Sequence, residues 1–300
     1  MLNRIILTLI IATFFSCKSE KPVSVSLEED VTILANDSLT GRETGTPQEI
    51  MAAEYLQKRM EQIGLEPKGN AGTYFQTFTF KPKTDPHKEV QYTITGDSTI
   101  TGTNVIGYID NQAENTVIIG AHYDHLGMGG EGSLYRGEEP QIHNGADDNA
   151  SGVAILLQVA DSLSSKYKGN NYLIISFSGE EMGLLGSNYF VKNATVDLSK
   201  VNYMLNMDMV GRLREDNTLS VSGTGTAPVW AQYLNVLNED FKLVLKESGI
   251  GPSDHTSFYL QDIPVLHFFT GQHEDYHKPS DDADKLNYEG MRKITGYIVD

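Results

Sequence analysis

The stretch Gly145–Gly152, which reads Gly-Ala-Asp-Asp-Asn-Ala-Ser-Gly, places two adjacent carboxylates between glycines, immediately before a predicted helix. The helix is predicted because apolar residues recur after this stretch at the spacing of a core-facing stripe, with Asn149 or Ser151 available as the N-cap. A single aspartate at such a position is commonly a cap or a partner of the helix dipole. For Asp147 beside Asp148 we favour a metal site, provided that the rest of the chain supplies matching ligands.

The composition limits the classes of partner and of metal site. The 300-residue chain has a formal net charge of −17. This charge argues against binding to nucleic acid or to anionic membrane surfaces, because phosphate binding needs clustered lysine and arginine. The one cysteine, Cys17, excludes an intramolecular disulfide and a cysteine-rich zinc site. Any metal must therefore be held by histidine and carboxylate side chains.

The N-terminal residues resemble the signal of a bacterial lipoprotein. Arg4 precedes the apolar run Ile5–Phe15, which is too short to span a membrane and is typical of the hydrophobic region of a signal peptide. Cys17 follows Ser16 at the end of this run, as the acylated cysteine of a lipobox does, although Phe14 stands where leucine is usual. A cleaved secretory signal with an incidental cysteine is the alternative.

We therefore predict three parts: a signal peptide over residues 1–17 with lipid attachment at Cys17, a flexible tether over 18–26, and one domain over 27–300. The expected location is the cell envelope. The lipid would anchor the protein to the outer membrane, facing the periplasm or the cell surface, and the protein would be secreted if Cys17 is not acylated. The anchor is the only membrane contact that we expect.

Predicted helices alternate with apolar runs. A capping box, with Pro47 as the first helical residue, begins a helix that ends at Gly64. Short β-rich runs follow at Tyr74–Phe80, Val90–Ile94 and Asn104–Ile109. Four continuous apolar runs are typical of strands buried on both faces: Val117–Ala121, Leu173–Phe177, Tyr203–Met207 and Val265–Phe269. The pattern predicts an α/β fold, a three-layer sandwich in which helices flank a central mixed, largely parallel sheet.

Polar side chains follow three of the buried runs. His122 and Asp124 follow the first run, Glu180 and Glu181 follow the second, and Asp208 follows the third. In open α/β sheets, ligands bind outside the carboxyl ends of the strands, so we expect these groups to converge. Adjacent side chains in extended backbone diverge, so one glutamate can bind metal while the other faces the substrate as a base.

His122 and Asp124 are two residues apart, so in extended backbone both side chains point to the same side. We assign Asp124 to the position behind the histidine, where its carboxylate would fix the imidazole tautomer. Asp208 lies in an apolar run, where an uncompensated charge costs several kcal/mol. Its alternative to metal binding is a salt bridge to Arg212 or Arg214.

The order of these motifs resembles the co-catalytic di-zinc aminopeptidases of metallopeptidase family twenty-eight. The resemblance runs from about Leu34 to the C-terminus and rests on His122-x-Asp124, Gly145–Gly152, Gly179–Gly183, Asn206-Met-Asp208 and Tyr276–Asp281. It implies a zinc-exopeptidase fold, with residues 27–300 as one metallopeptidase catalytic domain.

The resemblance also implies the zinc ligands. Asp147 would bridge two zinc ions, and the peptide bond that follows it would be cis. His122 and Asp208 would complete one site, and Glu181 and His277 the other. Five protein ligands, one of them shared, leave coordination positions for water and substrate.

Further roles follow from the same resemblance. Glu180 would be the general base, taking a proton from the attacking water and passing it to the leaving amine. Relatives carry a tyrosine just upstream of a Ser-Asp-His motif to bind the oxyanion, whereas this chain has glycine and proline there. His255 could replace that tyrosine, with Tyr259 and Tyr276 as alternatives.

The expected activity is removal of N-terminal residues from peptides. Carboxypeptidase or dipeptidase action with the same two zinc ions stays open, because the residues that read the substrate termini cannot be identified. Glutaminyl cyclases resemble this family but use one zinc ion, and a non-catalytic binding lipoprotein is a further alternative. The intact Asp-Asp pair and the full ligand set argue against both.

Other segments have simpler interpretations. The glycine-rich segment 127–144 is predicted to form a loop at the mouth of the cleft. We interpret the remaining histidines as ordinary side chains: His87, His125, His143, His267 and His273. We expect the natural chain to continue beyond Asp300, because the apolar periodicity of the last predicted helix is still running there.

Overall fold

The computed structural model describes residues 26–82, 90–92 and 98–300. The predicted signal peptide, Cys17 and most of the predicted tether lie outside these residues, and so does His87. Within the described ranges, no helix combines the length and the apolar character that a membrane span requires.

Within the described residues, nine strands form one sheet in the order β1-β3-β5-β4-β6-β9-β7-β8, with β2 also paired to β3. The strands are β1 (Glu66–Pro67), β2 (Phe75–Phe80), β3 (Ile100–Ile109), β4 (Thr116–His122), β5 (Asn171–Phe177), β6 (Val201–Met207), β7 (Thr218–Ser222), β8 (Lys242–Lys246) and β9 (Val265–Phe269). The helices are α1 (Leu27–Leu34), α2 (Pro47–Ile63), α3 (Gly152–Lys166), α4 (Leu185–Lys192), α5 (Trp230–Val236), α6 (His255–Tyr259) and α7 (Tyr288–Val299).

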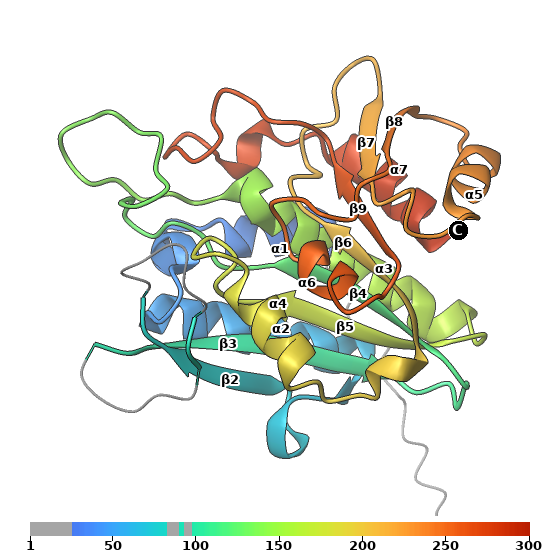
Figure 1. Ribbon diagram of the computed structural model, residues 1–300. Helices are drawn as coiled ribbons and strands as arrows, with labels where there is room; N and C mark the ends of the chain where they lie inside the picture. Colours follow the sequence, from blue (N-terminus) through green and yellow to red (C-terminus); the bar gives the residue numbers. More distant parts are fainter. Residues whose placement is uncertain (1–25, 83–89, 93–97) are drawn as a thin grey trace, which may run out of the picture.

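The centre of the sheet is parallel, as Figure 1 shows. Strands β5, β4, β6 and β9 run parallel to one another. Strand β3 is antiparallel to β5 on one side, and β7 is antiparallel to β9 on the other. The predicted mixed sheet with a parallel centre is therefore confirmed.

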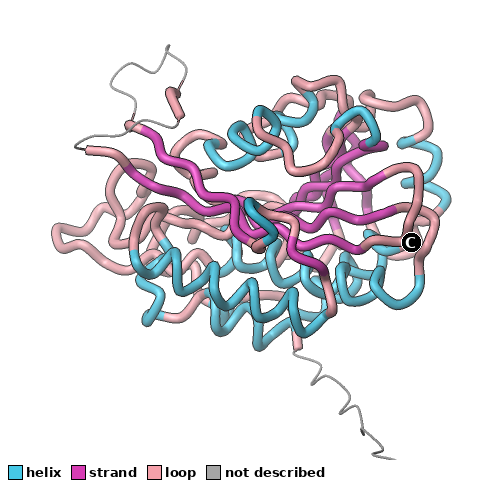
Figure 2. The backbone as a smooth tube through the Cα atoms, turned by 90° about the horizontal axis from the view of Figure 1, so that it is seen from below, coloured by secondary structure: helices cyan, strands magenta, loops and turns pink. Residues whose placement is uncertain are grey.

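Both faces of the sheet are covered, which gives three layers (Figure 2). Val117 and Ile119 belong to a core cluster shared with α1, α2, α3 and α7, whereas Ile118 belongs to a second cluster shared with α4 and α6. Alternate residues of one strand thus enter opposite cores, since successive side chains of a strand point to opposite faces. Burying each such side chain stabilises the fold by roughly 1.5–3 kcal/mol.

Helix α2 begins and ends as predicted. The Thr46 hydroxyl accepts a hydrogen bond from the Glu49 backbone N–H at 3.2 Å, and the Glu49 carboxylate accepts one from the Gly45 N–H at 2.6 Å. Gly64 ends the helix with a φ of +88°, a left-handed conformation that glycine adopts without strain.

Strands β7 and β8 were not predicted. Lys242, Val244 and Lys246 of β8 are exposed, whereas Leu243 and Leu245 pack against the core cluster of the α3 face. A short, half-buried strand gives a weaker pattern than a continuous apolar run. In the predicted run Val90–Ile94, Tyr92 forms an isolated bridge with Phe80, and residues 93 and 94 lie outside the described ranges.

The chain changes direction across the sheet at β4. This strand has β5 on one side and β6 on the other, and all three are parallel. In α/β sheets such a switch point leaves a crevice outside the carboxyl ends of the strands, where ligands bind. The predicted site residues follow these three strands.

Candidate metal centre

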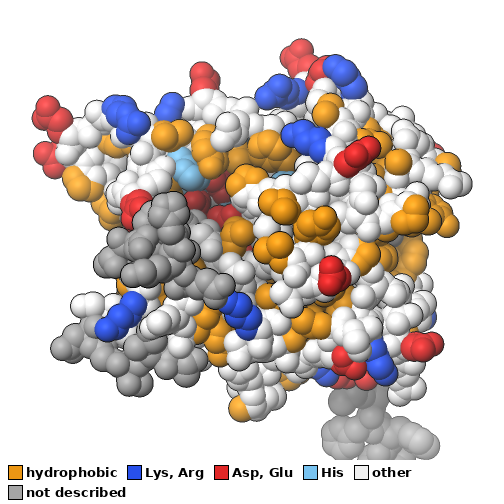
Figure 3. All heavy atoms as spheres, in the orientation of Figure 1, with side chains coloured by type: hydrophobic (Ala, Val, Ile, Leu, Met, Phe, Trp, Pro, Cys, Tyr) orange, Lys and Arg blue, Asp and Glu red, His pale blue; other side chains and the backbone are white. Residues whose placement is uncertain are grey.

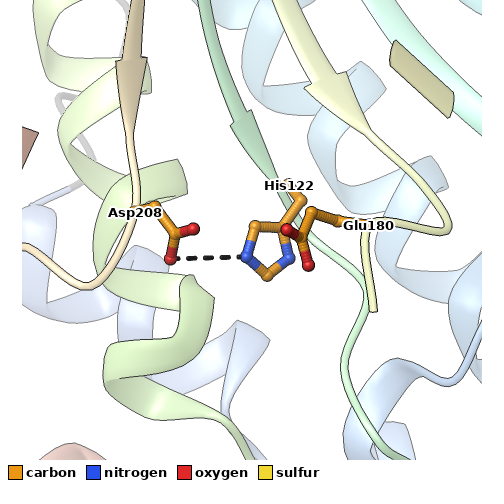
Figure 4. A group of neighbouring side chains, drawn as sticks. All are labelled: His122, Glu180 and Asp208. Atoms are coloured by element: carbon orange, nitrogen blue, oxygen red, sulfur yellow. Dashed lines mark ion pairs between the residues drawn. The ribbon is translucent and has the colours of Figure 1, made fainter. Parts of the chain in front are cut away.

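Three side chains form a first group of possible metal ligands. His122 ends β4, Asp208 follows β6, and Asp148 lies in the turn before α3. Nε2 of His122 lies 3.3 Å from Oδ1 of Asp148 and 3.5 Å from Oδ1 of Asp208. Figure 4 shows that Asp208 and Glu180 both point toward the His122 ring, and ligand atoms of these three residues lie within 4.8 Å of one another.

A second group lies on the other side of Asp148. Nε2 of His277 lies 3.1 Å from Oδ2 of Asp148 and 3.2 Å from Oε2 of Glu181. Asp148 therefore presents one carboxylate oxygen to each group. A carboxylate with this placement can join two metal ions.

The sequence analysis assigned the bridging role to Asp147, but the carboxylate that faces both groups is that of the next residue, Asp148. Oδ1 of Asp147 accepts hydrogen bonds from the Gly211 N–H at 2.6 Å and from the Ser151 hydroxyl at 3.0 Å, so its carboxylate points away from both groups. The cis peptide bond joins Asp148 to Asn149 rather than Asp147 to Asp148. The physical reason is that the two adjacent side chains of this turn diverge, and backbone and hydroxyl donors next to Gly211 hold the first of them.

Two residues near the C-terminus hold the aspartate pair in place. The Asp281 carboxylate accepts the backbone N–H groups of Asp147 and Asp148, each at 3.0 Å. Nε2 of His273 lies 3.1 Å from Oδ2 of Asp147, and Nδ1 of His273 accepts the Asp275 N–H, which leaves the ring proton on Nε2. His273, interpreted from the sequence as an ordinary histidine, thus supports the turn that carries Asp148.

Asp124 lies behind His122, the position that the sequence analysis assigned to it, and contacts the ring through both its side chain and its backbone. Its carboxylate lies 3.7 Å from Nδ1 of His122, whereas its backbone carbonyl lies 3.2 Å from the same nitrogen. The carbonyl can only accept, so Nδ1 carries the proton and Nε2 is free to bind a metal. The carboxylate also accepts hydrogen bonds from the backbone N–H groups of Glu180 and Glu181 and from the hydroxyl of Thr44.

The loop over residues 127–144 holds the second histidine. Nδ1 of His277 lies 2.8 Å from the carbonyl oxygen of Gly132, and the Leu134 N–H donates to the His277 carbonyl at 2.9 Å. The first contact places the His277 proton on Nδ1 and leaves Nε2 free, as for His122. The loop therefore belongs to the site rather than only bordering it.

His125, also interpreted as ordinary, orients Glu181. Its Nδ1 lies 2.6 Å from Oε1 of Glu181. Burial and Asp148 would raise the pKa of Glu181, but the hydrogen bonds of His125 and His277 lower it below its ordinary value. Proximity of His125 to the Glu-Glu motif could not be inferred from the sequence, because the two lie 56 residues apart.

The charges of the site favour bound cations. Burial alone would lower the pKa of His122, but Glu180 and Asp208 raise it well above its ordinary value. Burial raises the pKa of Glu180 well above its ordinary value, and the nearby acids Asp208 and Glu181 add to this effect. The buried carboxylates repel one another, and a bound cation would reduce this repulsion and favour their charged forms.

The donor geometry also suits zinc. Two atoms that each lie about 2.0–2.1 Å from a tetrahedral zinc ion are about 3.3 Å apart. The four separations between the histidine nitrogens and carboxylate oxygens of the two groups run from 3.1 to 3.5 Å. Imidazole nitrogen with carboxylate oxygen is a zinc donor set.

Both groups open into one cavity of about 240 Å³. Figure 3 shows acidic and histidine side chains at the bottom of a hollow on this face. Four residues of the two groups line the cavity, Asp148, Asp208, Glu181 and His277, and so does Glu180. The rest of the lining comes from β7, β8, β9 and the segments beside them: Met209, Ser222, Lys246, Gly251, Pro252, His255, His267, Phe269, Gln272 and Tyr276.

Of the three residues considered for binding the oxyanion, two line the cavity and one does not. His255 and Tyr276 line the cavity, and the two buried ring nitrogens of His255 have no hydrogen-bond partner among the described residues. Tyr259 lies against Gly249 instead. Arg212 was the alternative partner of Asp208, but its guanidinium binds Asp275 at 3.1 Å. Asp208 therefore stays a candidate metal ligand.

Comparison with known proteins identifies the family of the chain. The family model described as "Peptidase family M28" matches residues 104–300. A probable leucine aminopeptidase of Trichophyton verrucosum is 30% identical over 177 residues, covering 54% of this chain and 44% of that protein. Aminopeptidase YwaD of Bacillus subtilis is 27% identical over 198 residues, covering 61% and 39%. The chain thus spans about half the length, or less, of these curated relatives.

Solved structures share the fold. A zinc aminopeptidase of Bacillus subtilis superposes with a TM-score of 0.69 at 17% identity, covering 91% of this chain and 93% of that one. A Zn-dependent exopeptidase of Parabacteroides distasonis gives 0.72 at 17%, covering 91% and 95%. A glutaminyl cyclase of Bacteroides thetaiotaomicron gives 0.71 at 18%, with the same coverage. At these identities the likeness is one of fold, which the aminopeptidases and the cyclase have in common.

Proposed function

Because the chain belongs to peptidase family M28, we propose that it is a zinc-dependent aminopeptidase that uses two zinc ions to remove N-terminal residues from peptides. The observation that carries the proposal is the placement of Asp148, whose two oxygens face His122 and His277 separately. Asp208 completes the first ligand group and Glu181 the second.

These residues would hold the two ions. His122, Asp208 and Oδ1 of Asp148 would bind one ion, and His277, Glu181 and Oδ2 of Asp148 the other. Bound zinc supplies Lewis acidity, which polarises a carbonyl group and lowers the pKa of water. The presence of two ligand groups that both include a histidine and two carboxylates favours two ions over the single ion expected of a cyclase.

Glu180 would move the proton. Its carboxylate lines the cavity beside His122, where it can take a proton from the attacking water and pass it to the leaving amine. Its backbone N–H is bound to Asp124, which orients the Glu-Glu turn. His255 is buried at the wall of the same cavity, and neither ring nitrogen has a hydrogen-bond partner among the residues that the structure describes. It would donate a hydrogen bond to the substrate oxygen that becomes negative.

The size of the cavity supports action at a chain end. Its volume of about 240 Å³ is below the roughly 300–1,000 Å³ of sites for drug-sized ligands. A cavity of this size favours the end of a chain over the middle of a long peptide.

A peptide mixture with free and N-acetylated N-termini tests the proposal. The zinc-loaded protein should remove residues stepwise from free peptides and leave acetylated copies intact, with products read by mass spectrometry. Trimming from the other end, or cleavage of dipeptides alone, would move the activity to a carboxypeptidase or a dipeptidase. Zinc bound without any cleavage would contradict the peptidase.

We further propose that Cys17 carries a lipid anchor that attaches the protein to the outer membrane. The support is the sequence alone: the apolar run Ile5–Phe15 ends two residues before the only cysteine of the sequence. Cells that express the protein should incorporate a labelled fatty acid into it, and Cys17→Ala should abolish the label and release the protein from the membrane fraction. An unchanged membrane fraction for the variant would contradict the anchor.

A further inference from the structure

A row of polar side chains crosses four neighbouring strands beside the proposed zinc site. The strand register aligns residues of these strands in the order Lys246 (β8), Ser222 (β7), His267 (β9) and Asn206 (β6). Residues paired in a sheet point to the same face, so the four side chains stand side by side. Lys246, Ser222 and His267 line the cavity that contains the ligand groups.

The buried end of the row orients His267. Nδ2 of Asn206 lies 3.1 Å from Nδ1 of His267 and donates to the Ser253 hydroxyl at 2.8 Å. With the amide nitrogen toward the ring, Nδ1 accepts and Nε2 carries the proton. Burial lowers the pKa of His267 to about 3, so the ring is neutral near pH 7. His267 therefore offers a neutral N–H donor at the cavity wall.

The outer end of the row is a lysine. Lys246 is the one lysine or arginine among the described residues that line the cavity, and it forms no ion pair with the part of the chain that the structure describes. The acids of the proposed zinc site lie beyond the other end of the row, because Asp208 follows β6. Three strand spacings separate β6 from β8, roughly 14 Å between backbones. A substrate residue together with the lysine side chain can span that gap.

We propose that this row binds a carboxylate of the substrate, with Lys246 as its charged partner and Ser222 and His267 as hydrogen-bond donors. This inference rests on the proposed peptidase function and names its substrate class. The carboxylate comes either from an N-terminal aspartate or glutamate, or from the C-terminus of a very short peptide. Both place a planar anion opposite a cation and two neutral donors, a charge-assisted arrangement.

Another lysine of β8 provides a matched control. Lys242 lies on the same face of the strand, four residues earlier, and forms an exposed ion pair with Asp216 at 3.2 Å. Exposed ion pairs of this kind contribute little to stability. Lys242 therefore represents a surface lysine of the same strand that is absent from the cavity wall.

Binding of small amino-acid amides tests the row without hydrolysis. Calorimetry would compare L-isoglutamine, which has only a side-chain carboxylate, L-glutamine, which has only an α-carboxylate, and L-glutaminamide, which has neither. We expect one of the two acids to bind the zinc-loaded protein about tenfold more tightly than glutaminamide, and which acid does so identifies the source of the carboxylate. Lys246→Gln should remove this difference, and Lys242→Gln should keep it.

Peptide hydrolysis gives the parallel readout. In C-terminally amidated peptides, the ratio of kcat/KM for an N-terminal glutamate to that for glutamine shows whether the row binds a side-chain carboxylate. A comparison of kcat/KM for dipeptides with free and with amidated C-termini shows whether the row binds the C-terminal carboxylate. A difference that Lys246→Gln leaves unchanged, or the absence of any difference in the wild type, would overturn the inference. Binding that depends on Lys246 without hydrolysis of any peptide would instead contradict the peptidase and retain the carboxylate site.

Discussion

Nε of Arg42 donates a hydrogen bond to the backbone carbonyl of Tyr123 at 2.7 Å, across 81 residues of sequence. The same guanidinium, which is fully buried, donates to the carbonyls of Asn144 at 2.6 Å and Gly145 at 3.2 Å. Tyr123 directly follows the first-group histidine, and Gly145 begins the turn that carries Asp148. One side chain thus ties together two segments that bear metal ligands.

Replacing Arg42 by lysine should weaken both the fold and zinc binding. Lysine cannot reach three separate carbonyls in one plane, so buried acceptors lose their partners, at a cost of about 2 kcal/mol or more. Urea unfolding of the metal-free protein measures the loss of stability, and zinc titration measures the affinity. Arg59→Lys is the control, because Arg59 is buried against Asp30 outside the site and should lower stability without changing zinc affinity. Wild-type zinc affinity in Arg42→Lys would contradict the positioning role.

Asp148→Asn should release both zinc ions, because each ligand group loses one of its carboxylate oxygens. Asp147→Asn should weaken zinc binding only about 10–100-fold, the usual effect of altering a group behind the ligands. Metal analysis after dialysis and competition with a chromophoric chelator would rank the two variants. A larger loss of zinc from the Asp147 variant would return the bridging position to that residue.

Glu180→Gln should keep both zinc ions and the fold but slow hydrolysis roughly 10²–10⁴-fold, the usual contribution of a positioned base. Steady-state kinetics and metal analysis of the same sample separate the two effects. Glu54→Gln changes an exposed acid of α2 that does not line the cavity and should leave the rate unchanged. A Glu180 variant that hydrolyses peptides at the wild-type rate would exclude Glu180 as the base.

Glu49 should make stability depend on pH. Burial raises the pKa of Glu49 to about 7, above its ordinary value of 4.5. The folded state therefore holds the proton more tightly, and this stabilisation is complete below pH 4.5 and is lost as pH rises through 7. A shift of this size is worth at most roughly 3 kcal/mol.

The difference in unfolding free energy between the wild type and Glu49→Gln measures the Glu49 contribution. With a chelator present to exclude zinc, the wild type should lose stability relative to the variant from pH 4.5 to 7. Glu54→Gln, an exposed position of the same helix, should show no such change. A difference that stays flat over this range would mean that Glu49 titrates normally.

The sequence predicted the centre of the sheet well because β4, β5, β6 and β9 are buried on both faces and therefore read as continuous apolar runs. Strands β7 and β8, which follow β9 in the sheet, were missed because they lack such a run. Only alternate residues of β8 are partly buried, and its five residues begin and end with lysine. The wall of the cavity that these strands form was consequently absent from the sequence interpretation, although it carries Lys246 and Ser222.

The site could be predicted to the level of ligand types but not of every position. Strand ends bring His122, Glu181 and Asp208 together whatever the details of the turns. The choice between Asp147 and Asp148 depends instead on the backbone of one irregular turn, which no residue spacing reports. Partners such as His273 and Asp281 were missed because their contacts join residues 126 to 134 positions apart.

The segment around residues 277–281 completes both proposed ligand groups, although it lies late in the chain. The Gly132 carbonyl accepts from His277 across 145 residues, and the Asp281 carboxylate accepts the backbone N–H groups of Asp147 and Asp148. A chain that ends before residue 277 therefore lacks one ligand of the second group and also the carboxylate that fixes the turn of the first. Both groups depend on the same long-range step of folding, in which the C-terminal segment joins the rest of the domain.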